Sequence, residues 1–131
     1  MKLLALLTQP YLNKTAYKTF EDLITRALEN NELEELCCFF TSKAALISVL
    51  KTKVAQAYGA DFDDKQFEHV QNFLISLKPK ANLLVCGRAF NSLEFEKDSL
   101  NPNFELSGNV EMSMMISEYD KVIEFWWKIS W

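Results

Sequence analysis

Three short apolar runs constrain the fold of this chain more than any other feature of its sequence. They read LLALL at 3–7, ELCCFF at 35–40 and ANLLVC at 81–86. A strand that helices cover on both faces has a nearly continuous apolar sequence of this kind, whereas a half-exposed strand alternates. The three runs therefore predict the central strands of a parallel sheet.

The segments between these runs show the spacing of amphipathic helices. From Asn13 to Asn30, apolar side chains recur at helical intervals with charged side chains between them. Asp63 is a candidate helix cap, with Gln66 placed as in a capping box, and Pro79 marks the end of the same helix. Helices are predicted over 13–30, 43–57, 63–77 and 107–119.

The C-terminal segment VIEFWWKISW (122–131) differs, because every second residue from Ile123 onward is apolar. This pattern is typical of a strand with one buried face, at a sheet edge or beside a subunit contact. Trp126 and Trp131 are candidates for a protein interface, where large aromatic side chains are enriched. An equally good interpretation is that these two side chains complete the hydrophobic core.

Strands that alternate with helices predict βαβ crossovers and an α/β fold. We expect a three-layer α/β/α domain with a mostly parallel sheet of four or five strands. The length of 131 residues suits a single domain over 1–131 and leaves no room for a second.

Composition excludes several classes of function. Apolar residues make up 49% of the chain and charged residues 24%, as in ordinary globular proteins. The net charge of −4 argues against direct nucleic-acid binding and against an electrostatic membrane anchor. The apolar run Leu3–Leu7 is shorter than the core of a signal peptide, and no run is long enough to span a membrane. We therefore expect a cytoplasmic protein whose three cysteines are free thiols.

Cys86 is the candidate functional residue, because it ends the third apolar run and precedes Gly87 and Arg88. In open parallel α/β sheets, reactive groups lie beyond the carboxyl ends of the strands. Gly87 would leave the sulfur unscreened, a helix starting there would direct its free N–H groups toward the thiol, and Arg88 would add positive charge. Such surroundings favour a nucleophilic thiolate. A buried, inert Cys86 is the competing interpretation.

The other side chains with reactive or metal-binding potential have ordinary structural interpretations. Cys37 and Cys38 lie in the middle of an apolar run and are predicted to pack in the core. His69 is predicted to be exposed on a helix, which argues against a Cys–His hydrolase. The acidic cluster of Asp61, Asp63 and Asp64 is better explained as a helix start than as a metal site. The methionine cluster of Met112, Met114 and Met115 is better explained as part of the core or of an interface. The sequence has neither metal-ligand spacing nor a phosphate loop, so we expect no cofactor and no metal.

The order of elements and several short motifs resemble the DsrE/DsrF-like family of small sulfur carriers, its TusD-like members in particular. NLLVC (82–86) resembles the strand that ends on the family's persulfide-forming cysteine, and FELSG (104–108) resembles the motif that opens the family's last helix. YDKVIEF (119–125) and the opening MKLLALLT are similar as well, so the resemblance spans nearly the whole chain. Within FELSG, Ser107 and Gly108 are interpreted as the cap and tight entry of that helix.

This resemblance implies a sulfurtransferase-type carrier that accepts a sulfane sulfur as a persulfide on Cys86 and passes it to a partner protein, towards 2-thiolation of the tRNA wobble uridine. It also implies an oligomer with homologous subunits, a sulfur-donor protein and a sulfur-acceptor protein. The chain departs from the family pattern at GRAFNSLEF (87–95), which lacks a basic–Gly pair, and at TQPYLNK (8–14), which lacks glycine. The tail WWKISW (126–131) exceeds the pattern. The two loop departures bear on which donor and acceptor proteins are used, and the tail bears on how the protein assembles.

Two hypotheses remain at this stage. In the first, Cys86 carries sulfur; in the second, the protein is a non-catalytic DsrE-like assembly subunit in which Cys86 is inert. A receiver-like signalling domain would have an aspartate where this chain has Cys86. The sequence leaves open the donor, the acceptor, the stoichiometry and the choice between tRNA thiolation and sulfur oxidation.

Overall fold

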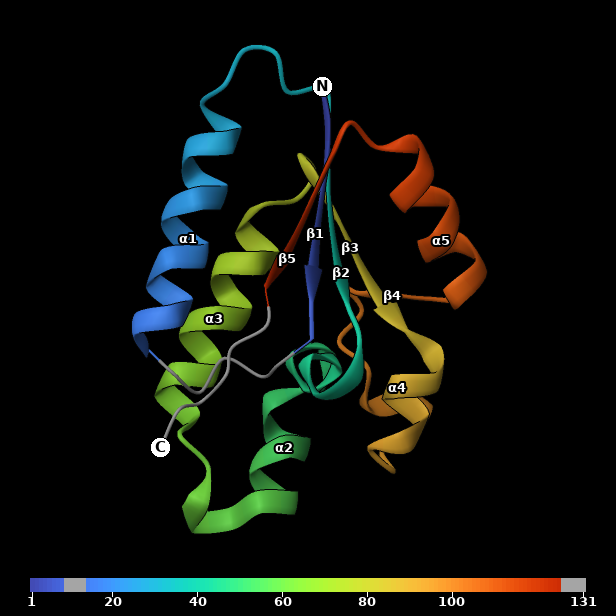
Figure 1. Ribbon diagram of the computed structural model, residues 1–131. Helices are drawn as coiled ribbons and strands as arrows, with labels where there is room; N and C mark the ends of the chain where they lie inside the picture. Colours follow the sequence, from blue (N-terminus) through green and yellow to red (C-terminus); the bar gives the residue numbers. More distant parts are fainter. Residues whose placement is uncertain (9–13, 126–131) are drawn as a thin grey trace.

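The computed structural model describes residues 1–8 and 14–125 and contains a parallel five-stranded sheet between helices (Figure 1). The strands are β1 (Lys2–Leu7), β2 (Glu35–Phe40), β3 (Ala81–Cys86), β4 (Glu105–Ser107) and β5 (Lys121–Phe125). Their order across the sheet is β4-β3-β2-β1-β5, and each pair of neighbouring strands is parallel. The predicted α/β fold with a parallel sheet is confirmed.

Helices cover both faces of this sheet. They are α1 (Lys14–Leu28), α2 (Lys51–Tyr58), α3 (Asp64–Ser76), α4 (Gly87–Ser92) and α5 (Asn109–Glu118). Helices α1 and α3 lie on one side of the sheet and α5 on the other (Figure 1). Phe20 of α1 meets Phe125 of β5 edge to face, with ring centres 4.9 Å apart. On the opposite face, Met115 of α5 is buried and lines a cavity with Cys37 and Leu84 of the sheet.

Burial explains the apolar runs. In β2, every residue from Leu36 to Phe40 has no exposed surface, because both faces of this central strand are covered. In β5 only one face is buried: Phe125 is buried and Ile123 partly so, whereas Glu124 is exposed. This strand lies at the edge of the sheet, as its alternation predicted. Trp126 and Trp131, the candidate interface residues, lie outside the described residues.

The start of α3 is confirmed. The Asp63 side chain accepts a hydrogen bond from the backbone N–H of Gln66 at 3.1 Å, which satisfies one of the free donors of the first turn. The Gln66 side-chain nitrogen is buried and has no hydrogen-bond partner in the described part of the chain. Helix α3 ends at Ser76, before Pro79.

The prediction of one helix over 43–57 is wrong in its middle. The chain forms a 3-10 turn at Ser42–Ser48, becomes extended at Val49, and enters α2 at Lys51. Val49 bridges to Leu100, and Gln71 of α3 donates hydrogen bonds to the carbonyls of Ile47 and Val49, each at 2.9 Å. These tertiary hydrogen bonds replace the helical ones, so local helix propensity does not decide the structure here.

The prediction of a helix from residue 107 is wrong at its start. Residues Glu105–Ser107 form the short strand β4, and Gly108 precedes α5 as its cap residue. The Ser107 hydroxyl donates to the carboxylate of Glu111 and makes no side-chain cap for the helix. Pairing with β3 gives three ladder positions, including Cys86 opposite Ser107, and the helix starts two residues later than predicted.

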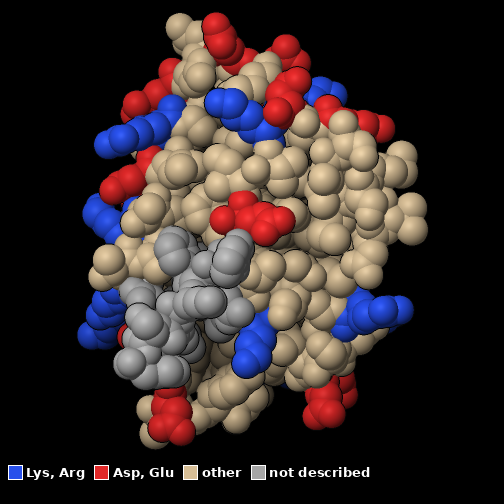
Figure 2. Space-filling model, viewed as in Figure 1, with Lys and Arg blue, Asp and Glu red and all other residues tan. Residues whose placement is uncertain are grey.

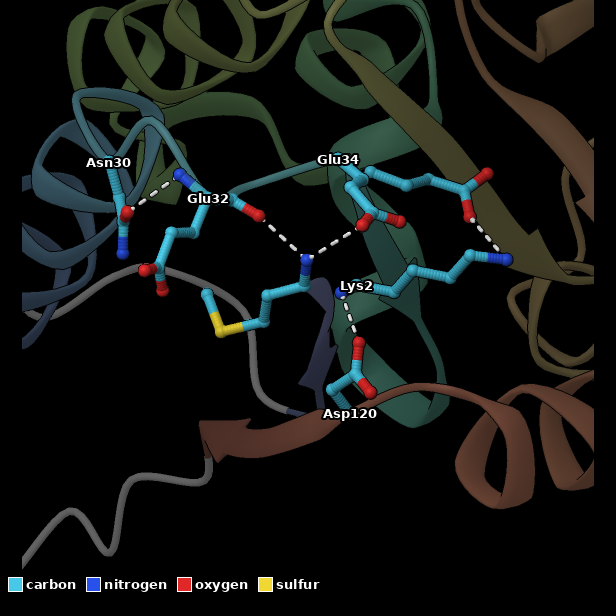
Figure 3. A network of polar contacts seen from close by, with 7 residues as sticks. Lys2, Asn30, Glu32, Glu34 and Asp120 are labelled. Carbon is cyan, nitrogen blue, oxygen red and sulfur yellow. Dashed lines mark hydrogen bonds and ion pairs between the residues drawn. The ribbon is translucent and has the colours of Figure 1, made fainter.

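Polar contacts tie the amino-terminal ends of three strands together (Figure 3). The α-amino group of Met1 donates to the carbonyl of Glu32 at 2.6 Å and lies 3.3 Å from the Glu34 carboxylate. The backbone N–H of Lys2 donates to Asp120 at 2.6 Å. These groups are largely exposed, so they fix geometry more than they add stability.

Candidate functional site around Cys86

Cys86 lies where the sequence placed it, at the carboxyl end of β3. It is both the last residue of the strand and the cap residue of α4, which begins at Gly87. Its backbone is extended, with φ −63° and ψ 119°, and its register partner on β4 is Ser107. The chain therefore changes from strand to helix at the thiol itself.

The sulfur is more enclosed than the sequence suggested. Cys86 is only 4% exposed, so the expectation of a solvent-facing thiol is wrong for this conformation. Its S–H donates to the side-chain oxygen of Asn109, the first residue of α5, with Sγ and Oδ1 3.8 Å apart. This distance is within reach of a hydrogen bond to sulfur, which is longer and weaker than one between oxygen and nitrogen.

Sequence reasoning missed Asn109. It lies 23 residues after Cys86 and reaches the sulfur only because β4 pairs with β3, which returns the chain to the carboxyl end of β3. The one available signal was its position directly after FELSG, at the opening of the last helix. An asparagine there has no chemical meaning until the pairing is known.

The beginnings of two helices meet at Cys86. Helix α4 starts in the next residue, and α5 starts with the residue that contacts the sulfur (Figure 1). The first N–H groups of a helix lack helical partners, and this end of a helix carries partial positive charge. The fold therefore brings two helix starts to the carboxyl end of β3.

Gly87 and Arg88 do less than the sequence implied. Gly87 starts α4 in an ordinary backbone conformation, and a Cβ there would meet the Ser107 carbonyl oxygen at 3.5 Å, a normal contact. Glycine is therefore not required for the turn. Arg88 is exposed, and no contact between its guanidinium and the sulfur is present among the described interactions.

The other two thiols are fully buried, as predicted. Cys37 lies on the α5 side of the sheet and lines a cavity of about 430 Å³ together with Glu35 and Glu111. Burial, and then the charges of Glu35 and Glu111, raises the pKa of Cys37 to about 12. Burial also raises the pKa of Cys38 well above its ordinary range. Both thiols are held in the unreactive protonated form.

His69 and the acidic and methionine clusters have the structural places expected of them. His69 is exposed, and its Nε2 lies 3.2 Å from the Glu21 carboxylate of α1. Asp63 caps α3, and Met115 is buried while Met114 is 54% exposed. Among the residues that the structure describes, no group of three or more histidine, cysteine or acidic side chains is placed to hold a metal ion.

The surface in view mixes acidic and basic side chains, without a continuous basic area (Figure 2). The side that carries α5 is largely uncharged in this view. Exposed apolar residues of α5 and β5 are Val110, Met114, Ile116 and Val122. No helix in residues 1–8 and 14–125 is long and apolar enough to cross a membrane.

Comparison with known proteins gives the class to which this fold and site belong. The model of the DsrE/DsrF-like family matches residues 1–125. The chain belongs to this family, which is generally tied to sulfur relay and whose members typically form oligomers.

Solved structures support the fold. The ychN protein from E. coli superposes with a TM-score of 0.61 at 17% sequence identity, over 95% of this chain and 97% of that one. The protein MTH1491 from Methanobacterium thermoautotrophicum superposes with a TM-score of 0.65 at 8% identity, over 94% of this chain and 97% of that one. A search of curated protein sequences finds no significant match.

Proposed function

We propose that this protein is a sulfur-relay carrier that holds a sulfane sulfur as a persulfide on Cys86 and passes it to a partner protein. The observation that carries the proposal is the place of Cys86 at the carboxyl end of β3, where α4 and α5 both begin. The destination we propose, from the resemblance to TusD-like members, is 2-thiolation of the tRNA wobble uridine.

The chemistry needs one nucleophilic sulfur and no cofactor or metal. The Cys86 thiolate attacks the terminal sulfur of a donor protein's persulfide, a new S–S bond forms, and the donor's own S–S bond breaks to release its thiolate. An acceptor thiolate then attacks the terminal sulfur on Cys86, and Cys86 leaves as the thiolate. Two successive exchanges move one sulfur atom without net oxidation.

Partners follow from this role. We propose that the whole chain, 1–131, acts as one domain in the cytoplasm, within an oligomer of homologous family subunits, and that a donor and an acceptor protein visit Cys86. The apolar side chains exposed on α5, Val110 and Met114, suit a subunit contact, because an isolated apolar surface favours burial. Direct contact with nucleic acid is not part of the proposal, since the net charge is −4.

Sulfur loading on matched variants tests the proposal. The wild-type protein, Cys86→Ser and the double variant Cys37→Ala/Cys38→Ala are incubated with a cysteine desulfurase and cysteine, and bound sulfane sulfur is measured by cyanolysis. We expect background levels for Cys86→Ser and wild-type levels for the double variant. Equal loading of Cys86→Ser and wild type would refute the proposal.

A second candidate function is that of a non-catalytic assembly subunit, and the low exposure of Cys86, 4%, favours it. In that case the wild-type protein loads no more sulfur than Cys86→Ser, yet still joins its homologous subunits. Sulfur loading of wild type and Cys86→Ser therefore separates the two functions, and size-exclusion chromatography of the same proteins checks that each still assembles.

A further inference from the structure

The contact between the Cys86 sulfur and the Asn109 side chain joins the end of β3 to the start of α5. The two residues differ in exposure: Cys86 is 4% exposed, whereas Asn109 is exposed at the first position of its helix. We propose that Asn109 is a positioning residue that covers the Cys86 thiol and must swing away before sulfur can be exchanged. The inference rests on the proposed function, because only a reacting thiol needs a movable cover.

The geometry shows which of the two partners can move. Cys86 is fixed by its pairing with Ser107 and by α4, in which Ala89 and Phe90 are buried. A second sulfur must come within bonding distance of Cys86, and a thiol with this exposure does not permit that approach. The Asn109 side chain, by contrast, lies at the surface next to Gly108, which is itself exposed. Its rotation into water breaks one weak hydrogen bond and disturbs no buried packing.

The amide group suits both states of the sulfur. In the closed state its oxygen accepts the S–H hydrogen bond, at 3.8 Å. Once the sulfur is anionic, the amide nitrogen can donate to it, because an asparagine side chain has both a donor and an acceptor end. A carboxylate at position 109 could only accept, and it would repel the thiolate. Asparagine and aspartate, which are nearly equal in size, should therefore have opposite effects.

Alkylation of the folded protein tests this role. Rates at each cysteine are followed by peptide mass spectrometry with iodoacetamide and with a bulky maleimide, for wild type, Asn109→Ala, Asn109→Asp and Asn109→Gln. Removing the cover in Asn109→Ala should raise the rate at Cys86 by about two- to tenfold, the factor expected for loss of one hydrogen bond. The increase should be larger for the bulky reagent. Cys86 should react more slowly in Asn109→Asp than in wild type. In Asn109→Gln, which keeps the amide group, its rate should be close to that of wild type.

Two controls distinguish a cover from general loosening of the fold. Cys37 and Cys38 report on loosening in the same samples, and Asn91→Ala changes another exposed asparagine, on α4. Unchanged reactivity of Cys86 in Asn109→Ala, or a parallel rise at Cys37 and Cys38, would overturn the inference.

Sulfur loading keeps this inference separate from the proposed function. If Asn109→Ala and Asn109→Asp change alkylation as expected but Cys86 loads no sulfur, the carrier function fails and the cover stands. If Cys86 loads sulfur at the same rate in wild type and Asn109→Ala, the carrier function stands and the cover fails.

Discussion

Cys37 and Cys86 lie on the same face of the sheet, under α5, yet their surroundings differ. Cys37 lies near the start of β2, between covering layers and close to the charges of Glu35 and Glu111, which help to keep it protonated. Cys86 lies at the end of β3, beside an uncharged amide and two helix starts. Position along the strand, more than burial, separates a packing thiol from a candidate for chemistry.

The sharpest test of this difference is alkylation of the wild-type protein at neutral pH. Cys86 needs only the rotation of one surface side chain to be reached, whereas Cys37 and Cys38 need the sheet to open. We expect Cys86 to react on the order of 100-fold faster than either, as local and larger openings differ in free energy. Comparable rates at the three cysteines, measured by peptide mass spectrometry, would remove the distinction.

Cysteine-to-serine substitutions compare the same positions in terms of stability. Cys38→Ser places a hydroxyl at a site with no exposed surface, and we expect it to lower the free energy of unfolding by about 1–3 kcal/mol. Cys86→Ser should cost less than about 1 kcal/mol, because Asn109 can accept a hydrogen bond from the new hydroxyl. Urea unfolding at neutral pH measures both. A Cys86→Ser variant as unstable as Cys38→Ser would contradict the account.

Stability should also depend on pH through Cys37. Below its ordinary pKa of 9.0 the thiol is protonated in both the folded and the unfolded chain, so its contribution to stability is fully present. Above that value the unfolded chain loses the proton first, since the folded pKa is about 12. The free energy of unfolding should fall as pH rises from 9 to 12, by up to about 1.4 kcal/mol per pH unit from this group.

The variant Cys37→Ala isolates this contribution. Its stability should decline less steeply with alkaline pH than that of the wild type, in urea unfolding curves recorded at several pH values. Equal slopes for the two proteins would show that Cys37 does not keep its proton in the folded state.

Arg88 should have the smallest effect. Because its side chain is exposed and no contact with the sulfur is described, Arg88→Ala should change the alkylation rate of Cys86 by less than about threefold. The exposed Lys97 offers a matched charge control, Lys97→Ala. A tenfold loss of rate in Arg88→Ala alone would mean that the guanidinium acts on the thiol.

Features that depend on local pattern could be predicted from the sequence. The apolar runs identified β1, β2 and β3, and helical spacing identified α1 and α3. The end of the third run located Cys86 at the carboxyl end of its strand. In each case neighbouring residues carry the information, because burial on both faces leaves a continuous apolar run.

Features that depend on distant contacts could not be predicted. The break at Val49 results from a hydrogen bond donated by Gln71 and from a β-bridge to Leu100, and both residues lie far along the chain. Strand β4 has three residues, too few to show a period, and its pairing brings Asn109 to the sulfur. The candidate nucleophile was therefore visible in the sequence, and its cover was not.

The account depends on the claim that Cys86, at the end of β3, carries the transferred sulfur. Peptide mapping of the wild-type protein, after incubation with a cysteine desulfurase and cysteine, tests this claim directly. The account predicts one additional sulfur atom on the peptide that contains Cys86, and none on the peptide that contains Cys37 and Cys38. Sulfur on the latter peptide, or on neither, would contradict it.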